Sequence, residues 1–151
     1  MPTLTGIIGG FGPLIEIKVM QSLPRVNALK RAGQKYSSPL IIKGLIDTGA
    51  FISALDPEII CALGLSPRGS IMIHTPSSGP DRTPCDTYDA CFIIGEKEVC
   101  SLSPNISVLS CELKSMGISA LIGRNVLDLC RFEYNGPMKT YCIEYDKSLK
   151  S

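Results

Sequence analysis

The stretch Leu45-Ile46-Asp47-Thr48-Gly49-Ala50 places a carboxylic acid directly after an apolar run. Residues 39–46 are rich in isoleucine and predict a buried strand that ends at Asp47. Burying a carboxylate is costly unless it is paired or hydrogen-bonded, so an acid at this point is unusual. Gly49 and Ala50 are small and let the backbone turn sharply or let another chain approach closely. The stretch indicates either a reactive carboxylate or an Asp that caps an ordinary turn.

Outward from this stretch, the pattern of apolar residues predicts a mostly β chain. Residues 14–19 alternate in part between apolar and polar side chains, which is typical of a half-buried strand. Residues 21–38 are interpreted as a connection with a short helical turn. Further segments are predicted as strands at 70–74, 83–94, 99–109 and 120–123, a short helix at 124–130, and a closing hairpin at 131–144 through the turn Asn135-Gly136.

Capping and turn residues divide these strands. Asp56 suits the N-cap of a helix, Pro57 its first position and Gly64 its C-terminal end, so a short helix is predicted here. Residues 75–80 form a cluster rich in Ser, Pro and Gly. This cluster predicts the tip of a β-hairpin between the strands on either side.

The bulk composition limits the classes of function. A chain of 151 residues fits one domain, residues 1–151, and its 44% hydrophobic and 19% charged residues are typical of a globular protein. The formal net charge is +1 and no basic run stands out, so we expect neither nucleic acid nor a membrane surface as a partner. No apolar stretch is long enough to cross a bilayer.

The seven cysteines are an odd number and none forms a CxxC pair. Together with a start that lacks the features of a signal peptide, they favour a reduced, cytoplasmic protein. A zinc site built from His74, Cys85 and Cys91 is conceivable, but the spacing matches no familiar zinc pattern. We therefore expect no metal and no organic cofactor.

A second motif, Leu121-Ile122-Gly123-Arg124-Asn125, strengthens the case for a reactive Asp47. With Asp47-Thr48-Gly49-Ala50 and the intervening hairpin, it resembles the retropepsin family, the dimeric aspartic proteases of retroviruses and their bacterial relatives. The resemblance covers about residues 14–142, and residues 64–89 look most like the bacterial branch. It implies a mainly β, closed barrel of the acid-protease type with one or two short helices, active as a homodimer.

The resemblance also implies roles for individual residues. Asp47 would be the catalytic acid, the Thr48 hydroxyls of two copies would brace each other, and Gly49 would present its carbonyl group to the substrate. Ala50, Gly123 and Arg124 would support the site. The hairpin tip would be the substrate-covering flap: His74, Thr75, Pro76, Ser77, Ser78 and Gly79.

Aspartic proteolysis needs two carboxylates that share one proton. This chain has one Asp-Thr-Gly and about half the length of a two-lobed enzyme, so the second Asp47 is expected from a second copy related by a two-fold axis. The expected substrate is a peptide or protein segment bound in an extended form.

One residue departs from the family pattern. Phe51 stands where Ser or Asp is common, and Arg124 therefore needs another partner, either Asp56 or a backbone carbonyl group. Phe51 also motivates an alternative function, a catalytically inactive peptide-binding or dimerisation module with the same fold.

Overall fold

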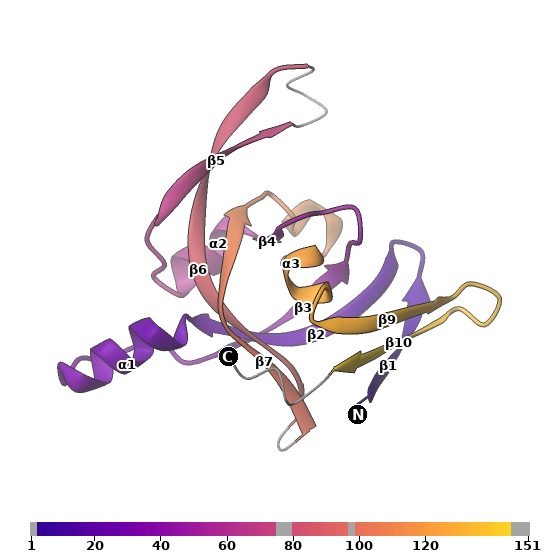
Figure 1. The fold of residues 1–151 in the computed structure, drawn as a ribbon, viewed down its shortest axis with the longest axis horizontal. Helices are drawn as coiled ribbons and strands as arrows, with labels where there is room; N and C mark the ends of the chain where they lie inside the picture. Colours follow the sequence, from indigo (N-terminus) through magenta and orange to yellow (C-terminus); the bar gives the residue numbers. More distant parts are fainter. Residues whose placement is uncertain (1–2, 75–79, 97–98, 146–151) are drawn as a thin grey trace.

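The computed structural model describes residues 3–74, 80–96 and 99–145 (Figure 1). Its elements, in chain order, are β1 (Thr3–Gly9), β2 (Gly12–Gln21), α1 (Leu23–Arg31), β3 (Leu40–Ile46), β4 (Ser53–Leu55), α2 (Pro57–Ala62), β5 (Gly69–His74), β6 (Arg82–Glu96), β7 (Val99–Ser110), the 3-10 helix η1 (Lys114–Met116), β8 (Ala120–Ile122), α3 (Arg124–Leu127), β9 (Cys130–Asn135) and β10 (Thr140–Tyr145).

Six of these strands close into a barrel. Around it the order is β2, β6, β7, β4, β8 and β3, and β3 pairs with β2 again to complete the ring. The pairs β3–β8 and β4–β7 are parallel, whereas the other four are antiparallel. The expected closed β-barrel is confirmed, and the described residues form three α-helices where one or two were predicted.

The barrel encloses the main hydrophobic core. Phe92, Ile17 and Leu55 are among its largest fully buried side chains, and each comes from a different barrel strand. Burying such a side chain contributes about 1.5–3 kcal/mol relative to leaving it in water. The core therefore supplies the rigid support on which the ends of β3 and β8 are held.

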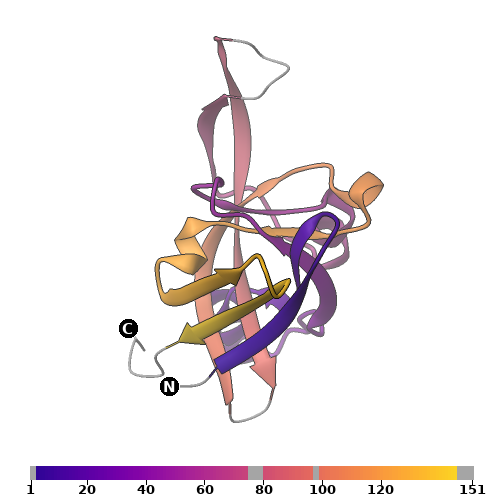
Figure 2. The same ribbon diagram turned by 90° about the vertical axis from the view of Figure 1, so that its right-hand side faces the viewer.

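A smaller sheet of β1, β10 and β9 lies beside the barrel and joins it through the pairing of β1 with β2 (Figures 1 and 2). The start of the chain was not predicted as a strand because its glycines obscure the alternation of side chains. In the structure, the Tyr141 ring of β10 covers Gly6 of β1, and a Cβ atom at Gly6 would clash with that ring. The cross-strand aromatic ring therefore supplies the packing that the glycine itself lacks.

The predicted strands at 14–19, 39–46, 70–74, 83–94, 99–109 and 120–123 are confirmed as β2, β3, β5, β6, β7 and β8, except that β3 begins at Leu40 and β8 ends at Ile122. The helix predicted at 124–130 is too long, because α3 ends at Leu127 and Cys130 begins β9. The predicted connection at 21–38 instead contains the nine-residue helix α1, with Pro24 in its first turn. The closing hairpin is confirmed, but its loop spans residues 136–139 and the left-handed residue is Lys139 (φ 54°) rather than Gly136. An Asn135 side chain that accepts from Met138 N–H at 3.1 Å shapes this longer loop.

Candidate active site

The two sequence motifs meet because β3 and β8 are parallel neighbours. Ile46 and Ile122 are paired at the ends of these strands, and Asp47 N–H donates to the Ile122 carbonyl oxygen at 3.0 Å. The residues that follow each strand, Asp47 and Gly123, therefore emerge side by side. A parallel pair needs a long crossover connection, which explains why residues so far apart in the sequence form one site.

The turn after β3 holds the Asp47 carboxylate in a defined position. Its Oδ1 atom accepts the Gly49 N–H at 3.0 Å, and the Ala50 N–H donates to the Asp47 carbonyl oxygen at 3.2 Å. Asp47 is half-buried, whereas Thr48 and Gly49 are exposed. The carboxylate thus caps its own turn, as the ordinary-turn interpretation requires, and still reaches the surface, as a reactive carboxylate requires.

Arg124 binds the same turn from α3. Its backbone N–H donates to the Ala50 carbonyl oxygen at 2.8 Å, and its Nη1 atom donates to the Thr48 carbonyl oxygen at 2.9 Å. Of the two partners considered from the sequence, the structure therefore shows a backbone carbonyl group. A charged donor on a carbonyl oxygen makes a stronger hydrogen bond than a neutral one. Arg124 fixes the backbone on either side of Gly49.

Gly123 is required by a close approach of two backbone segments. It is buried and extended (φ −90°, ψ −176°), so its conformation alone would suit any residue. A Cβ atom here would lie 2.7 Å from the Ile52 carbonyl carbon and 2.9 Å from the Ala50 carbonyl oxygen. Because these neighbours are backbone atoms, no side-chain rotation could relieve the contact.

Ser53, which was not predicted as part of the site, forms a hydrogen-bond network with Asn125 of the second motif. The Ser53 N–H and hydroxyl group both donate to Asn125 Oδ1, at 2.9 and 2.8 Å. The Ser53 hydroxyl oxygen accepts the Gly123 N–H at 2.9 Å, and Asn125 Nδ2 donates to the Ser107 carbonyl oxygen at 2.8 Å. Ser53 is fully buried. The network ties β4, β7 and the start of α3 together directly beneath the Asp47 turn.

Asp56 caps α2, as predicted, and also joins a second segment. Its Oδ1 accepts the Glu58 N–H at 3.0 Å, while Oδ2 accepts the N–H groups of Leu113 and Lys114, each at 2.9 Å. Burial by itself would raise the pKa of this carboxyl group, but the three amide donors and the Lys114 charge outweigh it and lower the pKa. Asp56 is thus a structural carboxylate, and it is not the partner of Arg124.

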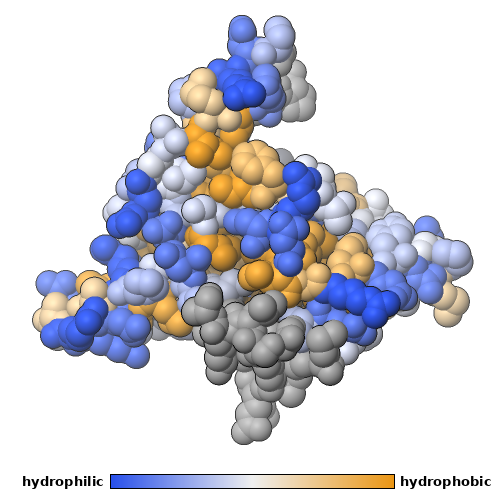
Figure 3. Space-filling view, in the orientation of Figure 1, coloured by the Kyte–Doolittle hydropathy of each residue, from blue (hydrophilic) through white to orange (hydrophobic). Residues whose placement is uncertain are grey.

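The predicted flap corresponds to the β5–β6 hairpin, which stands out from the barrel (Figure 2). His74 ends β5, is exposed, and accepts a hydrogen bond at Nε2 from Arg82 Nε at 3.1 Å. The other five residues assigned to the flap, 75–79, lie outside the described residues. Apolar surface gathers between this hairpin and the body of the barrel (Figure 3). Met72 and Phe51 are among the exposed large apolar residues, at 53% and 55% exposure.

The conceivable zinc site does not form. Cys85 and Cys91 lie on one strand, β6, six residues apart, which corresponds to roughly 20 Å. Within the described parts of the chain, no cluster of three or more His, Cys, Asp or Glu side chains could hold a metal ion.

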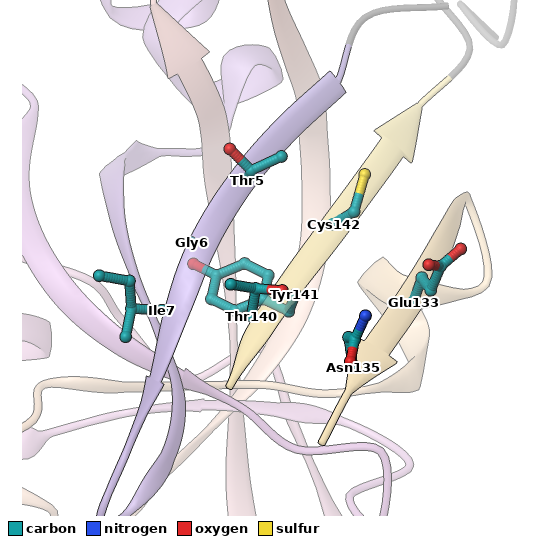
Figure 4. A pocket seen from close by; sticks show the side chains of 8 residues that line it. All are labelled: Thr5, Gly6, Ile7, Glu133, Asn135, Thr140, Tyr141 and Cys142. Atoms are coloured by element: carbon teal, nitrogen blue, oxygen red, sulfur yellow. The ribbon is translucent and has the colours of Figure 1, made fainter. Parts of the chain in front are cut away.

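Two surface hollows, of about 380 and 320 Å³, contain none of the predicted site residues. The first lies on the sheet of β1, β10 and β9 around Tyr141 and Thr5 (Figure 4). None of the helices within residues 3–74, 80–96 and 99–145 has the length and apolar character needed to cross a membrane.

Comparison with solved structures shows the fold. The chain is similar to a structure described as a retropepsin-like aspartic protease from Rickettsia conorii, with a TM-score of 0.58 and 18% sequence identity. The similarity covers 95% of this chain and 90% of that one. No protein-family model and no curated protein matches the sequence. The fold is therefore retropepsin-like, as the sequence resemblance implied, whereas the assignment to the bacterial branch stays a prediction.

Proposed function

We propose that this chain is an aspartic endopeptidase of the retropepsin type, active as a homodimer. The observation that carries the proposal is the half-buried Asp47 carboxylate at the joined ends of β3 and β8, oriented by the Gly49 N–H. Arg124 and the Ser53–Asn125 network hold the surrounding backbone. The fold shared with a structure described as an aspartic protease supports the same conclusion.

In this mechanism, the two Asp47 carboxylates of a dimer share one proton. Two like charges within hydrogen-bonding distance cannot both ionise, so the pair titrates as a unit. The ionised carboxylate removes a proton from a water molecule, which attacks the scissile carbonyl carbon, while the protonated partner donates to the carbonyl oxygen. The Gly49 N–H, bound to Asp47 Oδ1, leaves Oδ2 for the shared proton and the water. No cofactor or metal takes part.

We place the contact with the second copy at β9. This strand ends the sheet within the described residues and follows α3, whose first residue binds the Asp47 turn. If two β9 strands pair antiparallel about Phe132, Arg131 lies opposite the partner's Glu133, and Glu133 lies opposite the partner's Arg131. Within its own chain the exposed Arg131 pairs with Glu144 at 3.4 Å and Glu133 at 3.8 Å, and in this arrangement it would also face the partner's Glu133. The edge is thus complementary in charge to a second copy of itself, which suits an isologous two-fold contact.

The proposed substrate is an extended peptide with apolar side chains. It would lie between the Asp47 turn and the β5–β6 hairpin, where apolar surface gathers (Figure 3). Met72 of β5 and Phe51, which follows the Asp47 turn, are exposed apolar residues of these two segments. Exposed apolar patches rimmed by polar groups are typical of binding sites. An extended peptide can also hydrogen-bond with the exposed backbone of Gly49 and of the hairpin, as an added strand does.

The test is cleavage of an unbiased peptide library at acidic to neutral pH by wild-type protein, Asp47→Asn and the matched control Asp128→Asn. Asp128 is an exposed carboxylate at the end of α3. Wild type and Asp128→Asn should cleave and be inhibited by a pepstatin-like compound, and Asp47→Asn should not cleave. Cleavage by Asp47→Asn at the wild-type rate would refute the assignment.

The alternative function is an inactive module that binds peptides or dimerises. Phe51 motivates it, because a large exposed apolar side chain follows the Asp47 turn at the position where Ser or Asp is common in the family. Peptide binding without cleavage by the wild-type protein, unchanged in Asp47→Asn, would establish this alternative in place of the enzyme.

A further inference from the structure

Two cysteines face each other at the base of the β5–β6 hairpin. Cys85 lies in β6, and Cys111 is the first residue after β7. The antiparallel register pairs Thr87 with Leu109. Continuing it by two residues on each strand places Cys85 opposite Cys111.

The backbone hydrogen bonds show which kind of cross-strand position this is. The Cys111 N–H donates to the Leu55 carbonyl oxygen at 3.0 Å, and β4 lies on the other side of β7 from β6. The Cys111 backbone therefore points away from β6, so Cys85 and Cys111 occupy a non-hydrogen-bonded pair. In such pairs the Cα atoms are about 4.5 Å apart, which lies within the range that a disulfide spans.

A side-chain contact supports the same placement. The preceding residue, Ser110, directs its carbonyl group toward β6, and the Cys85 thiol lies 3.9 Å from that oxygen atom. Cys85 is half-buried and Cys111 is exposed, so a small reagent can reach the pair. We propose that Cys85 and Cys111 form a reversible disulfide that ties the base of the β5–β6 hairpin to the segment leaving β7.

The oxidant is a small-molecule disulfide such as glutathione disulfide. The Cys111 thiolate attacks one of its sulfur atoms and releases one small thiol, which leaves a mixed disulfide on Cys111. The Cys85 thiolate then attacks the Cys111 sulfur atom and releases the second small thiol. The protein loses two electrons and two protons, and the two small thiols that leave carry these electrons and protons away.

The surroundings make this reaction slow. Although Cys111 is exposed, partial burial of its thiol raises its pKa, and the neighbouring Cys85, Asp56 and Glu112 raise that pKa further. A raised pKa leaves little of the reactive thiolate at neutral pH. The pair is therefore suited to respond to sustained oxidation, while a reducing environment keeps it as two thiols.

The cross-link would act on the hairpin because of where β6 is supported. Strand β6 is paired with β7 as far as Thr87. At Cys85, two residues nearer the hairpin tip, β6 is paired with Ile71 of β5 but no longer with β7. A covalent bond at Cys85 moves the point of attachment two residues further up the hairpin. If the proposed function holds, the restrained hairpin admits substrate more slowly, and oxidation lowers the rate of cleavage.

The experiment treats the full chain with glutathione disulfide and maps disulfides by mass spectrometry of its peptides. Wild type and the control Cys61→Ser, which removes an exposed cysteine elsewhere, should give a linked Cys85–Cys111 peptide. Cys85→Ser and Cys111→Ser should give only mixed disulfides with glutathione. Failure of wild type to form this link, or preferential formation of another pair, would overturn the proposal.

Hydrogen exchange provides a readout that does not depend on catalysis. Amide exchange in residues 69–74 should slow by roughly tenfold or more in the oxidised wild type and recover with dithiothreitol. If the disulfide forms and this exchange does not slow, the proposal that the disulfide restrains the β5–β6 hairpin is wrong. Both measurements can be made on Asp47→Asn, so loss of the proposed proteolysis and failure of the disulfide are distinguishable.

Discussion

Replacing Gly123 by Ala should destabilise the site and the fold together. The new Cβ atom would lie 2.7 Å from the Ile52 carbonyl carbon, where ordinary contact begins at 3.4 Å, so two backbone segments must separate. Overpacking of this kind costs about 1–3 kcal/mol. The movement also weakens the hydrogen bonds from Gly123 N–H to Ser53 Oγ and from Arg124 N–H to the Ala50 carbonyl oxygen. Each contributes about 0.5–1.5 kcal/mol.

The expected total is about 2–4 kcal/mol, which corresponds to a fall in Tm of roughly 5–15 °C for a chain of this size. Thermal melts and urea titrations of wild type and Gly123→Ala measure it. Gly10→Ala is the matched control, because a Cβ atom at Gly10 meets nothing within 4 Å, and its free energy of unfolding should change by less than about 0.5 kcal/mol. If Gly123→Ala melts within about 2 °C of wild type, the close approach does not constrain this position and the reasoning is wrong.

Three further changes test neighbouring parts of the structure. Ser53→Ala should lower the free energy of unfolding by about 1–3 kcal/mol in urea titrations, because it leaves the buried Gly123 N–H without an acceptor; an unchanged midpoint would contradict this. The pKa of Asp56 is lowered in the folded state, so its carboxylate stabilises the fold fully only above the pKa of about 4 that the group has in the unfolded chain. The free energy of unfolding of the wild type should therefore fall as the pH drops below about 4. Asp56→Asn should be less stable at neutral pH and should lose less on acidification; equal acid sensitivity in both would refute the assignment. Arg131→Glu should weaken dimers in sedimentation by up to roughly tenfold in Kd, and adding Glu133→Arg should restore them, whereas no recovery would exclude the β9 contact.

The short-range features were predictable from the sequence because each has a local cause. The isoleucine-rich run before Asp47 alternates between buried and less buried positions in β3, as a barrel strand does. Asp56 and Pro57 start α2, and Gly64, in the left-handed region at φ 63°, follows its end. Each of these signals depends on the preferences of a few adjacent residues.

Other features were missed because their cause lies far away in the chain. Ser53 is a short-strand serine with no distinctive neighbours, and only its contacts with Asn125 and Gly123 make it part of the site. The second function of Asp56, binding the amides of Leu113 and Lys114, likewise joins residues separated by more than fifty positions. A sequence pattern shows which residues could cap a helix but cannot show which distant backbone groups need an acceptor.

The sequence by itself determined that an acid follows a buried strand and that a second apolar motif ends in Gly123. It determined this because strand periodicity, chain turns and capping depend on neighbouring residues. Only the tertiary structure decided that the two motifs touch, that Gly123 must lack a side chain because backbone lies 2.7 Å from its missing Cβ atom, and that Arg124 binds the Thr48 carbonyl oxygen. These contacts depend on the parallel pairing of β3 and β8, which is a property of the closed barrel rather than of either segment.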